Sequence, residues 1–98
     1  MSVYVIVQGK VENRGLLDQY VAKAGPTIKS YQGRTIAFDE QPEEVEGKTE
    51  YPRTVIVEFP SMAAFRAWYD SPEYQEVLPM RLKATKGTLI VAKGSASS

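Results

Sequence analysis

One acidic side chain stands inside a strand-like run of otherwise apolar and hydroxyl residues. This is Glu58, within residues 54–59. Burial of a charge without a partner costs several kcal/mol, so this carboxylate needs either a function or an ionic partner. In the first case desolvation raises the pKa of Glu58 and makes it a catalytic general base near neutral pH. In the second case it pairs with Arg34, Arg53 or Arg81 in a structural salt bridge.

Two arginines form the second group with chemical potential. Arg53 and Arg81 can clamp a carboxylate or another anion, because each guanidinium presents a planar fork of donors. Their alternative partner is the acidic stretch at 39–50. The remaining candidate ligand-binding residues are aromatic or polar: Tyr4, Gln8, Asp39, Trp68 and Tyr74.

The five additional candidates rest on different arguments. Tyr4, Gln8 and Asp39 are chosen from strand phase alone, and a register shift of one residue would move them to the opposite face. Trp68 falls on the buried stripe of a helix, so core packing is its alternative role. Tyr74 can orient a ligand through its hydroxyl, or it can pack its ring with the hydroxyl at the surface.

The chain contains no cysteine and no histidine. Without cysteine there are no disulfides, thiolate nucleophiles or Cys-ligated metal sites. Without histidine the usual haem ligand and the commonest general base near neutral pH are missing. We therefore expect no metal and no cofactor, and any acid–base chemistry falls to Asp, Glu, Lys or Tyr.

Charge and length limit the partners and the number of domains. The 98 residues carry 12 basic and 12 acidic side chains, so no overall field attracts nucleic acid. The sequence has neither the basic start of a signal peptide nor an apolar run long enough to span a bilayer. We expect a cytoplasmic protein without a nucleic-acid or membrane partner. Its single domain covers residues 1–94, followed by a flexible tail at 95–98.

The spacing of apolar residues predicts the elements that position these side chains. The first helical region follows Asn13 as N-cap and is expected to kink or restart at Gly25-Pro26, because proline lacks an N–H. The second begins at Ser61, is capped again at Ser71 and is expected to end at Pro79. Strands are predicted at 3–9, 34–39, 53–59 and 86–92. This order predicts an α+β, ferredoxin-like βαββαβ fold with a four-stranded antiparallel sheet and the helices on one face.

Both faces of the predicted sheet are apolar, although one of them lacks helices. Strand phase puts Ile36 and Phe38 on the helix side. The other face then holds Ile6, Thr35, Ala37, Ile56, Ile90 and Ala92. A second copy packed sheet to sheet covers such a face, which predicts a homodimer. The enclosed layer is expected to be an apolar cavity with Tyr4, Gln8, Asp39 and Glu58 as its polar groups.

Residues 53–61, Trp68-Tyr-Asp-Ser-Pro-Glu-Tyr74 and Arg81 closely resemble a bacterial family of uncharacterised proteins, catalogued as domain of unknown function 1330. The resemblance extends over nearly all of residues 1–94, and the Trp68–Tyr74 segment is its most specific part. The family is similar to the dimeric α/β-barrel superfamily, which implies the same fold and the same homodimer. Relatives on this fold include cofactor-free monooxygenases, isomerases and proteins without known catalysis, so the resemblance implies no particular activity.

These observations together predict a dimeric protein that binds a small organic molecule, or converts it without a cofactor, in a cavity between the sheet and the partner. Glu58 is then the acid–base or orienting group, and an arginine supplies charge. The alternative is a non-catalytic dimeric module with a structural role or a protein partner.

Overall fold

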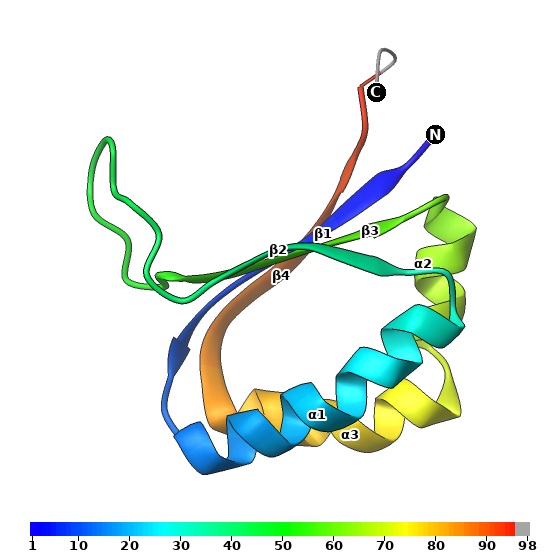
Figure 1. The fold of residues 1–98 in the computed structure, drawn as a ribbon, viewed down its shortest axis with the longest axis horizontal. Helices are drawn as coiled ribbons and strands as arrows, with labels where there is room; N and C mark the ends of the chain where they lie inside the picture. The colour runs from blue at the N-terminus through cyan, green and yellow to red at the C-terminus, as the bar shows by residue number, and fades with distance from the viewer. Residues whose placement is uncertain (96–98) are drawn as a thin grey trace.

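The computed structural model describes residues 1–95 and has the predicted ferredoxin-like α+β fold. Its sheet is antiparallel with the strand order β2-β3-β1-β4. Helices α1 and α3 lie side by side over one face of the sheet, and α2 lies at one end of the same layer (Figure 1). The elements in chain order are β1 (Val3–Val11), α1 (Arg14–Ser30), β2 (Arg34–Asp39), β3 (Arg53–Phe59), α2 (Met62–Tyr69), α3 (Pro72–Ala84) and β4 (Thr85–Lys93). Of the predicted flexible tail at 95–98, residues 96–98 lie outside the described residues.

The helix end predicted at Pro79 is wrong, and the first helix does not restart at Pro26. Helix α1 runs without interruption through Pro26, and α3 runs through Pro79 to Ala84. Both proline rings lie on exposed sides of their helices, where water can satisfy the carbonyl that loses its N–H partner. Gly25 also relieves the first site, since it has no Cβ to meet the ring of the proline that follows. The continuity of α3 carries its buried face on to Arg81.

The two caps that the sequence predicts in the second helical region are confirmed. The hydroxyl of Ser61 accepts a hydrogen bond from the backbone N–H of Ala64, and the hydroxyl of Ser71 accepts one from Tyr74. Each cap satisfies a backbone donor that the first turn of a helix leaves unpaired. The caps therefore start two separate helices, α2 and α3, which approach the core from different directions (Figure 1).

A bulge in β2 changes which of its residues face the helices. The pairing of β2 with β3 shifts between Thr35 and Ala37, so Thr35 lies opposite Val57 and Arg34 lies opposite Glu58. The inserted residue, Ile36, is 46% exposed. Simple alternation put Thr35 on the outer face, and this is wrong because a bulge reverses the phase of the residues before it.

The core lies between the sheet and the helical layer. Its centre is aromatic: the ring of Trp68 lies with its centroid 4.0 Å from that of Tyr74 and 5.4 Å from that of Phe59. The buried apolar residues are Val3, Val5, Leu17, Tyr20, Ala24, Val57, Phe59, Phe65, Trp68, Tyr74, Val77, Leu78 and Ala84. Within residues 1–95 no helix is both long and apolar enough to cross a membrane.

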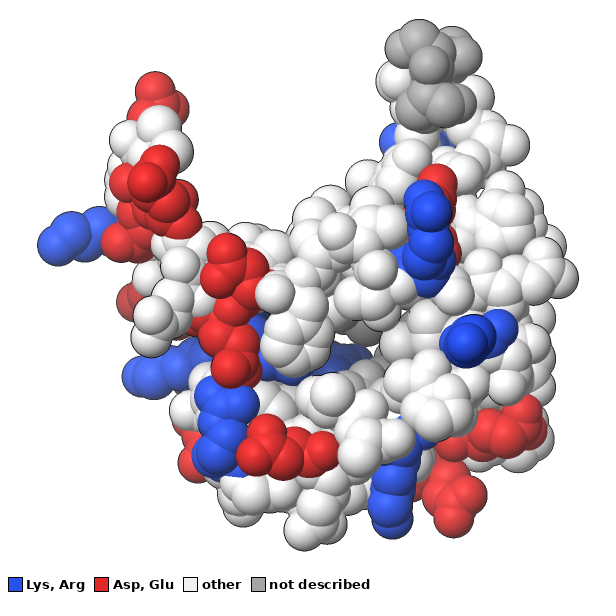
Figure 2. Space-filling view, viewed as in Figure 1, with Lys and Arg blue, Asp and Glu red and all other residues white. Residues whose placement is uncertain are grey.

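Residues 40–52, which we call the acidic arm, leave the body of the molecule between β2 and β3. The arm contains neither helix nor strand, and it rises on the side of the sheet that faces away from the helices (Figure 1). Acidic side chains dominate its surface (Figure 2). Its first residue, Glu40, remains close to the body and contributes to the region described next.

Candidate functional site

A pocket of about 110 Å³ lies between the helix-facing side of the sheet and helices α1 and α3. Aliphatic side chains of β1, β3, β4 and α1 form the largest part of its wall. Tyr20, Trp68, Tyr74, Arg53 and Arg81 also line it, as do Thr35 and Phe38 of β2. An apolar wall with a few polar groups is typical of ligand sites. The volume suits a compact molecule, because it is well below the roughly 300–1,000 Å³ of ordinary ligand pockets.

Arg81 is the feature of this pocket that most needs explanation. It is only 8% exposed, and its Nε donates a hydrogen bond of 3.3 Å to the hydroxyl of Tyr74. The ion pairs among residues 1–95 involve other arginines, and no carboxylate lies within ion-pair distance of Arg81. A buried guanidinium therefore faces an apolar pocket with hydroxyl groups as its partners. Such a cation is costly unless a counter-charge is supplied.

Two buried tyrosines surround this cation. The hydroxyl oxygens of Tyr20 and Tyr74 are 2.8 Å apart and share one hydrogen bond. Burial, followed by the proximity of Tyr74, raises the pKa of Tyr20 well above its ordinary value, so this hydroxyl stays neutral and can donate. Tyr74 is fully buried, hydroxyl included. The interpretation that its hydroxyl lies at the surface is wrong, because Arg81 and Tyr20 give that hydroxyl buried partners.

Arg53 lines the same pocket but is already neutralised. It is 5% exposed, and its Nε donates to Glu40 at 3.1 Å. Glu40 also accepts a hydrogen bond from Arg14 at 2.9 Å. The hydrogen bond from Arg14 is the largest cause that lowers the pKa of Glu40, and Arg53 lowers it further. The guanidinium carbon of Arg53 lies 4.9 Å from the ring centroid of Phe38. The two arginines proposed as a clamp thus share one pocket, yet only Arg81 lacks an acidic partner in the described chain.

Arg53 and Phe38 separate the inner pocket from an open cleft. Both residues line the 110 Å³ pocket and also a cleft of about 600 Å³ at the root of the acidic arm. Phe38 is 52% exposed and so reaches the solvent in the open cleft. This pair of side chains therefore stands between the solvent and the pocket.

Trp68 combines the two roles that the sequence left open. Its side chain is 2% exposed and packs in the aromatic core, and it also lines the pocket. Its indole N–H donates to the hydroxyl of Thr27 at 3.0 Å, which holds the ring between α1 and α2. Since Trp68 is the single tryptophan of the chain, its fluorescence reports on the pocket.

The sheet divides the predicted site residues into two groups. Tyr4, Gln8 and Glu58 lie on the outer face and do not line the pocket. Asp39, at the end of β2, borders the open cleft instead. Thus the structure brings together Arg53, Trp68, Tyr74 and Arg81, and separates the other candidates from them.

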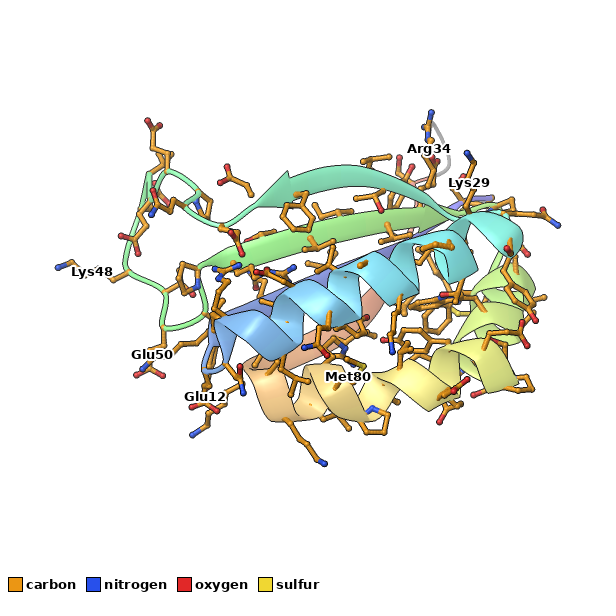
Figure 3. All side chains as sticks on the ribbon, turned by 60° about the horizontal axis from the view of Figure 1, so that its bottom comes forward. Glu12, Lys29, Arg34, Lys48, Glu50 and Met80 are labelled. Carbon is orange, nitrogen blue, oxygen red and sulfur yellow. The ribbon has the colours of Figure 1, made fainter. Side chains whose placement is uncertain are left out.

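Glu58 is paired on the outer face. Its Oε1 is 2.8 Å from Nη2 of Arg34, and the hydroxyl of Tyr4 lies 3.4 Å from its Oε2. Arg34 points away from the helical layer (Figure 3). The hydrogen bond from Arg34 is the largest cause that lowers the pKa of Glu58. In the described chain the pKa of Glu58 thus moves opposite to the direction expected for a general base, and the geometry is that of the salt-bridge alternative, formed with Arg34.

Replacement of Glu58 by glutamine is expected to make stability less sensitive to acid. A carboxyl group whose pKa is lowered by folding stabilises the folded state at any pH above the pKa that it has in the unfolded chain, near the ordinary 4.5. This contribution to stability is lost as the pH falls through the pKa of the folded state. The stability difference between wild type and Glu58→Gln should therefore be constant near neutral pH and shrink in acid. Urea denaturation at a series of pH values measures it, with Glu76→Gln as control. A pH-independent difference would argue against the ion pair.

Two residues of the pocket region were not among the candidates from sequence. Tyr20 appears in the sequence only as part of the apolar stripe of α1, and Glu40 only as one of several acids. A tyrosine on a buried stripe needs a partner for its hydroxyl, which is a signal that could have marked Tyr20. No comparable signal marks Glu40. Within residues 1–95 there is no cluster of three or more acidic side chains that could hold a metal ion.

Solved structures resemble this chain over almost its whole length. A protein of unknown function from Rhodopseudomonas palustris is 18% identical with a TM-score of 0.80, covering 96% of this chain and 82% of that one. A dimeric ferredoxin-like protein of unknown function from Jannaschia sp. CCS1 is 18% identical with a TM-score of 0.67, covering 96% and 100%. SnoaB, a cofactor-independent oxygenase from Streptomyces nogalater, is 11% identical with a TM-score of 0.70, covering 99% and 98%.

At these identities the structural similarity shows the fold alone. No curated protein matches this chain. The family described as "Domain of unknown function (DUF1330)" matches residues 2–95. The match covers nearly the entire chain, including the Trp68–Tyr74 segment and Arg81, and the protein therefore belongs to the DUF1330 family.

Proposed function

We propose that this protein binds a small organic molecule in the pocket between the sheet and helices α1 and α3. The observation that carries the proposal is Arg81, a buried cation beside an apolar pocket and without an acidic partner in the described chain. An anionic group of a ligand would remove the cost of that charge. The proposed site is on the helix side of the sheet, whereas the sequence led us to expect it between the sheet and a partner.

The proposal concerns binding, and turnover is a separate outcome. SnoaB is a cofactor-independent oxygenase on the same fold, but a shared fold at 11% identity does not carry an activity across. The pocket offers the hydroxyls of Tyr20 and Tyr74 and the guanidinium of Arg81 as groups that can donate hydrogen bonds. These donors can stabilise a negatively charged oxygen atom of a ligand. The same arrangement serves simple binding of an anion and also reactions in which negative charge develops on an oxygen, so it does not distinguish binding from turnover.

A pocket-filling variant tests this function. Native mass spectrometry of protein purified gently from its own host should show wild type with a discrete additional mass. Val55→Phe extends a pocket-lining side chain into the cavity and should remove that mass. Val45→Phe makes the same change at a position that is 81% exposed, in the acidic arm, and should retain it. The absence of ligand from all three proteins would favour the alternative, a non-catalytic dimeric module.

We also infer that two copies of the chain pair through the outer face of the sheet. Ile56, Ile6 and Ile90 lie side by side across β3, β1 and β4, and Ile90 is 56% exposed. A contiguous apolar surface of this kind favours association. The neighbours from Jannaschia sp. CCS1 and Thermobifida fusca YX are dimeric proteins of the same fold, which supports the inference.

Replacement of Ile90 by aspartate is expected to produce a monomer. In a twofold-symmetric interface the change buries two carboxylates without partners, so the dimer dissociation constant should rise at least about a hundredfold. Light scattering coupled to size-exclusion chromatography measures the mass in solution. Leu82→Asp is the matched control, since Leu82 is 62% exposed on α3, away from the proposed interface. A dimer that persists in Ile90→Asp would exclude this face.

A further inference from the structure

Three of the polar side chains that line the pocket form one connected cluster with a positive charge. Tyr20 on α1 shares a hydrogen bond with Tyr74 on α3, and Tyr74 accepts another from Nε of Arg81, further along the same helix. All three residues are at most 9% exposed. Most of the remaining wall is aliphatic or aromatic. The unpaired charge of the lining and two buried hydroxyl groups therefore lie together in this Tyr20–Tyr74–Arg81 cluster.

The cluster offers donors in the arrangement that a carboxylate requires. The hydrogen bond to Tyr74 uses Nε of Arg81. The two Nη groups are the remaining donors of the guanidinium, and their spacing matches the two oxygen atoms of a carboxylate. The two tyrosine hydroxyls have two hydrogens, and the bond between their oxygens uses one of them. The other hydrogen can point to a ligand oxygen. A neutral amide of the same shape would place its own N–H groups against these donors and leave them unpaired.

The number of charges in the pocket limits the charge of the ligand. Arg53 lines the same pocket but already pairs with Glu40, so Arg81 supplies the one uncompensated charge among the lining residues of the described chain. A monoanion neutralises that charge. A phosphate monoester brings close to two negative charges near neutral pH, and the second would be buried without a partner.

The remaining wall determines the body of the ligand. Apart from the cluster, the lining near Trp68 consists mainly of valine, leucine and isoleucine side chains, and the volume is about 110 Å³. A hydroxyl or amino group on the body would lose its hydrogen bonds to water and meet few new partners, since only Thr35 and Arg53 are polar among the other described residues of the lining. A compact body without polar substituents fits this lining best.

We infer that the ligand is a small monocarboxylate with a compact apolar body, and that Arg81 with the hydroxyl pair of Tyr20 and Tyr74 holds its carboxylate. This inference rests on the proposed function and names the class of molecule that the pocket takes. It also assigns a role to the hydrogen bond between Tyr20 and Tyr74, which orients one hydroxyl hydrogen toward the ligand.

Two probes of the same shape test the inference on the full-length wild-type chain. Benzoate carries the carboxylate, and benzamide replaces it with a neutral group. Titration of each, followed by the fluorescence of Trp68, gives the two dissociation constants. Benzoate is expected to bind about 10- to 100-fold more tightly than benzamide, the range that hydrogen bonds to a charged group support.

Variants on α3 then identify the residue responsible. Arg81→Met should weaken benzoate by about 10- to 100-fold and leave benzamide almost unchanged. Arg81→Lys keeps the charge without the fork, and an intermediate loss is expected. Lys83→Met, at an exposed position of the same helix, should change neither constant. Circular dichroism melts establish that each variant is folded, and the comparison of the two probes on wild type does not depend on any variant.

The outcomes separate this inference from the proposed function. Equal binding of benzoate and benzamide, with both lost in Val55→Phe, would overturn the carboxylate assignment and leave ligand binding in the pocket intact. A host ligand that mass spectrometry identifies as neutral would do the same. Binding of neither probe, together with wild type free of host ligand, would overturn both. Selective loss of benzoate in Arg81→Met supports both.

Discussion

Replacement of Gly87 by alanine is expected to lower the free energy of unfolding by about 3 kcal/mol or more, at the upper end of what overpacking costs. Gly87 in β4 lies opposite Gly9 in β1. A Cβ at this position would overlap the carbonyl oxygen of Gln8 and lie 2.7 Å from Cα of Gly9. These atoms belong to the backbone of the neighbouring strand and cannot rotate away. Strand β4 would have to move, and its hydrogen bonds to β1 would weaken.

Thermal and urea denaturation measure this effect. For a domain of this size about 1 kcal/mol corresponds to about 4–8 °C, so the melting temperature of Gly87→Ala should fall by more than about 12 °C. Gly15→Ala is the control, since Gly15 lies in the first turn of α1 with Asn13 Oδ1 as its nearest neighbour at 3.8 Å. That substitution should stabilise by up to about 1 kcal/mol, because alanine favours the helix. An unchanged melting temperature in Gly87→Ala would contradict the close approach of β1 and β4.

Replacement of Tyr74 by phenylalanine is expected to lower the free energy of unfolding by about 1–3 kcal/mol, the cost of leaving buried polar groups unpaired. The ring remains, so its packing against Trp68 persists. The missing oxygen, however, was the partner of the Tyr20 hydroxyl at 2.8 Å and of Arg81 Nε at 3.3 Å. Both groups stay buried. Benzoate affinity should also fall, by about tenfold, since one oriented donor is lost from the cluster.

Two comparisons make the Tyr74 result specific. Tyr31→Phe removes a hydroxyl that donates to Glu73 at the protein surface, at 2.6 Å, and should cost less than about 1 kcal/mol. In a double-mutant cycle with Tyr20→Phe, the double variant should lose less stability than the sum of the single variants, because the two hydroxyls share one hydrogen bond. Additive losses would show that the hydroxyls act independently, contrary to the structure.

The fold follows from signals that act over short stretches of sequence. Ser61 and Ser71 cap the helices that they were predicted to cap, and the strand at 53–59 has the predicted bounds. Capping hydroxyls and strand alternation depend on neighbouring residues, which the sequence displays directly. The sequence alone therefore suffices to predict the fold class, including the helices on one face of the sheet.

The errors within elements arise where tertiary packing overrides a local signal. A restart at Pro26 and a helix end at Pro79 do not occur, because each ring lies at the helix surface and both helices continue. Whether a proline is exposed depends on where the rest of the chain packs. Likewise Thr35 lies on the helix side because of a bulge in β2, which alternation does not reveal.

Residue types alone named Arg53, Trp68, Tyr74 and Arg81 as candidates, and the structure brings these four to one pocket. Strand phase was enough to put Tyr4, Gln8 and Glu58 together on one face. Neither signal says which side of the sheet keeps a cavity, because that depends on the space left between α1, α3 and the strands after long-range packing. The sequence offered three arginines as partners of Glu58 and could not choose among them. In the structure Glu58 pairs with Arg34, Glu40 pairs with Arg53, and Arg81 has no acidic partner in the described chain. Such pairings join residues far apart in sequence, and the arrangement of the folded elements brings them within reach.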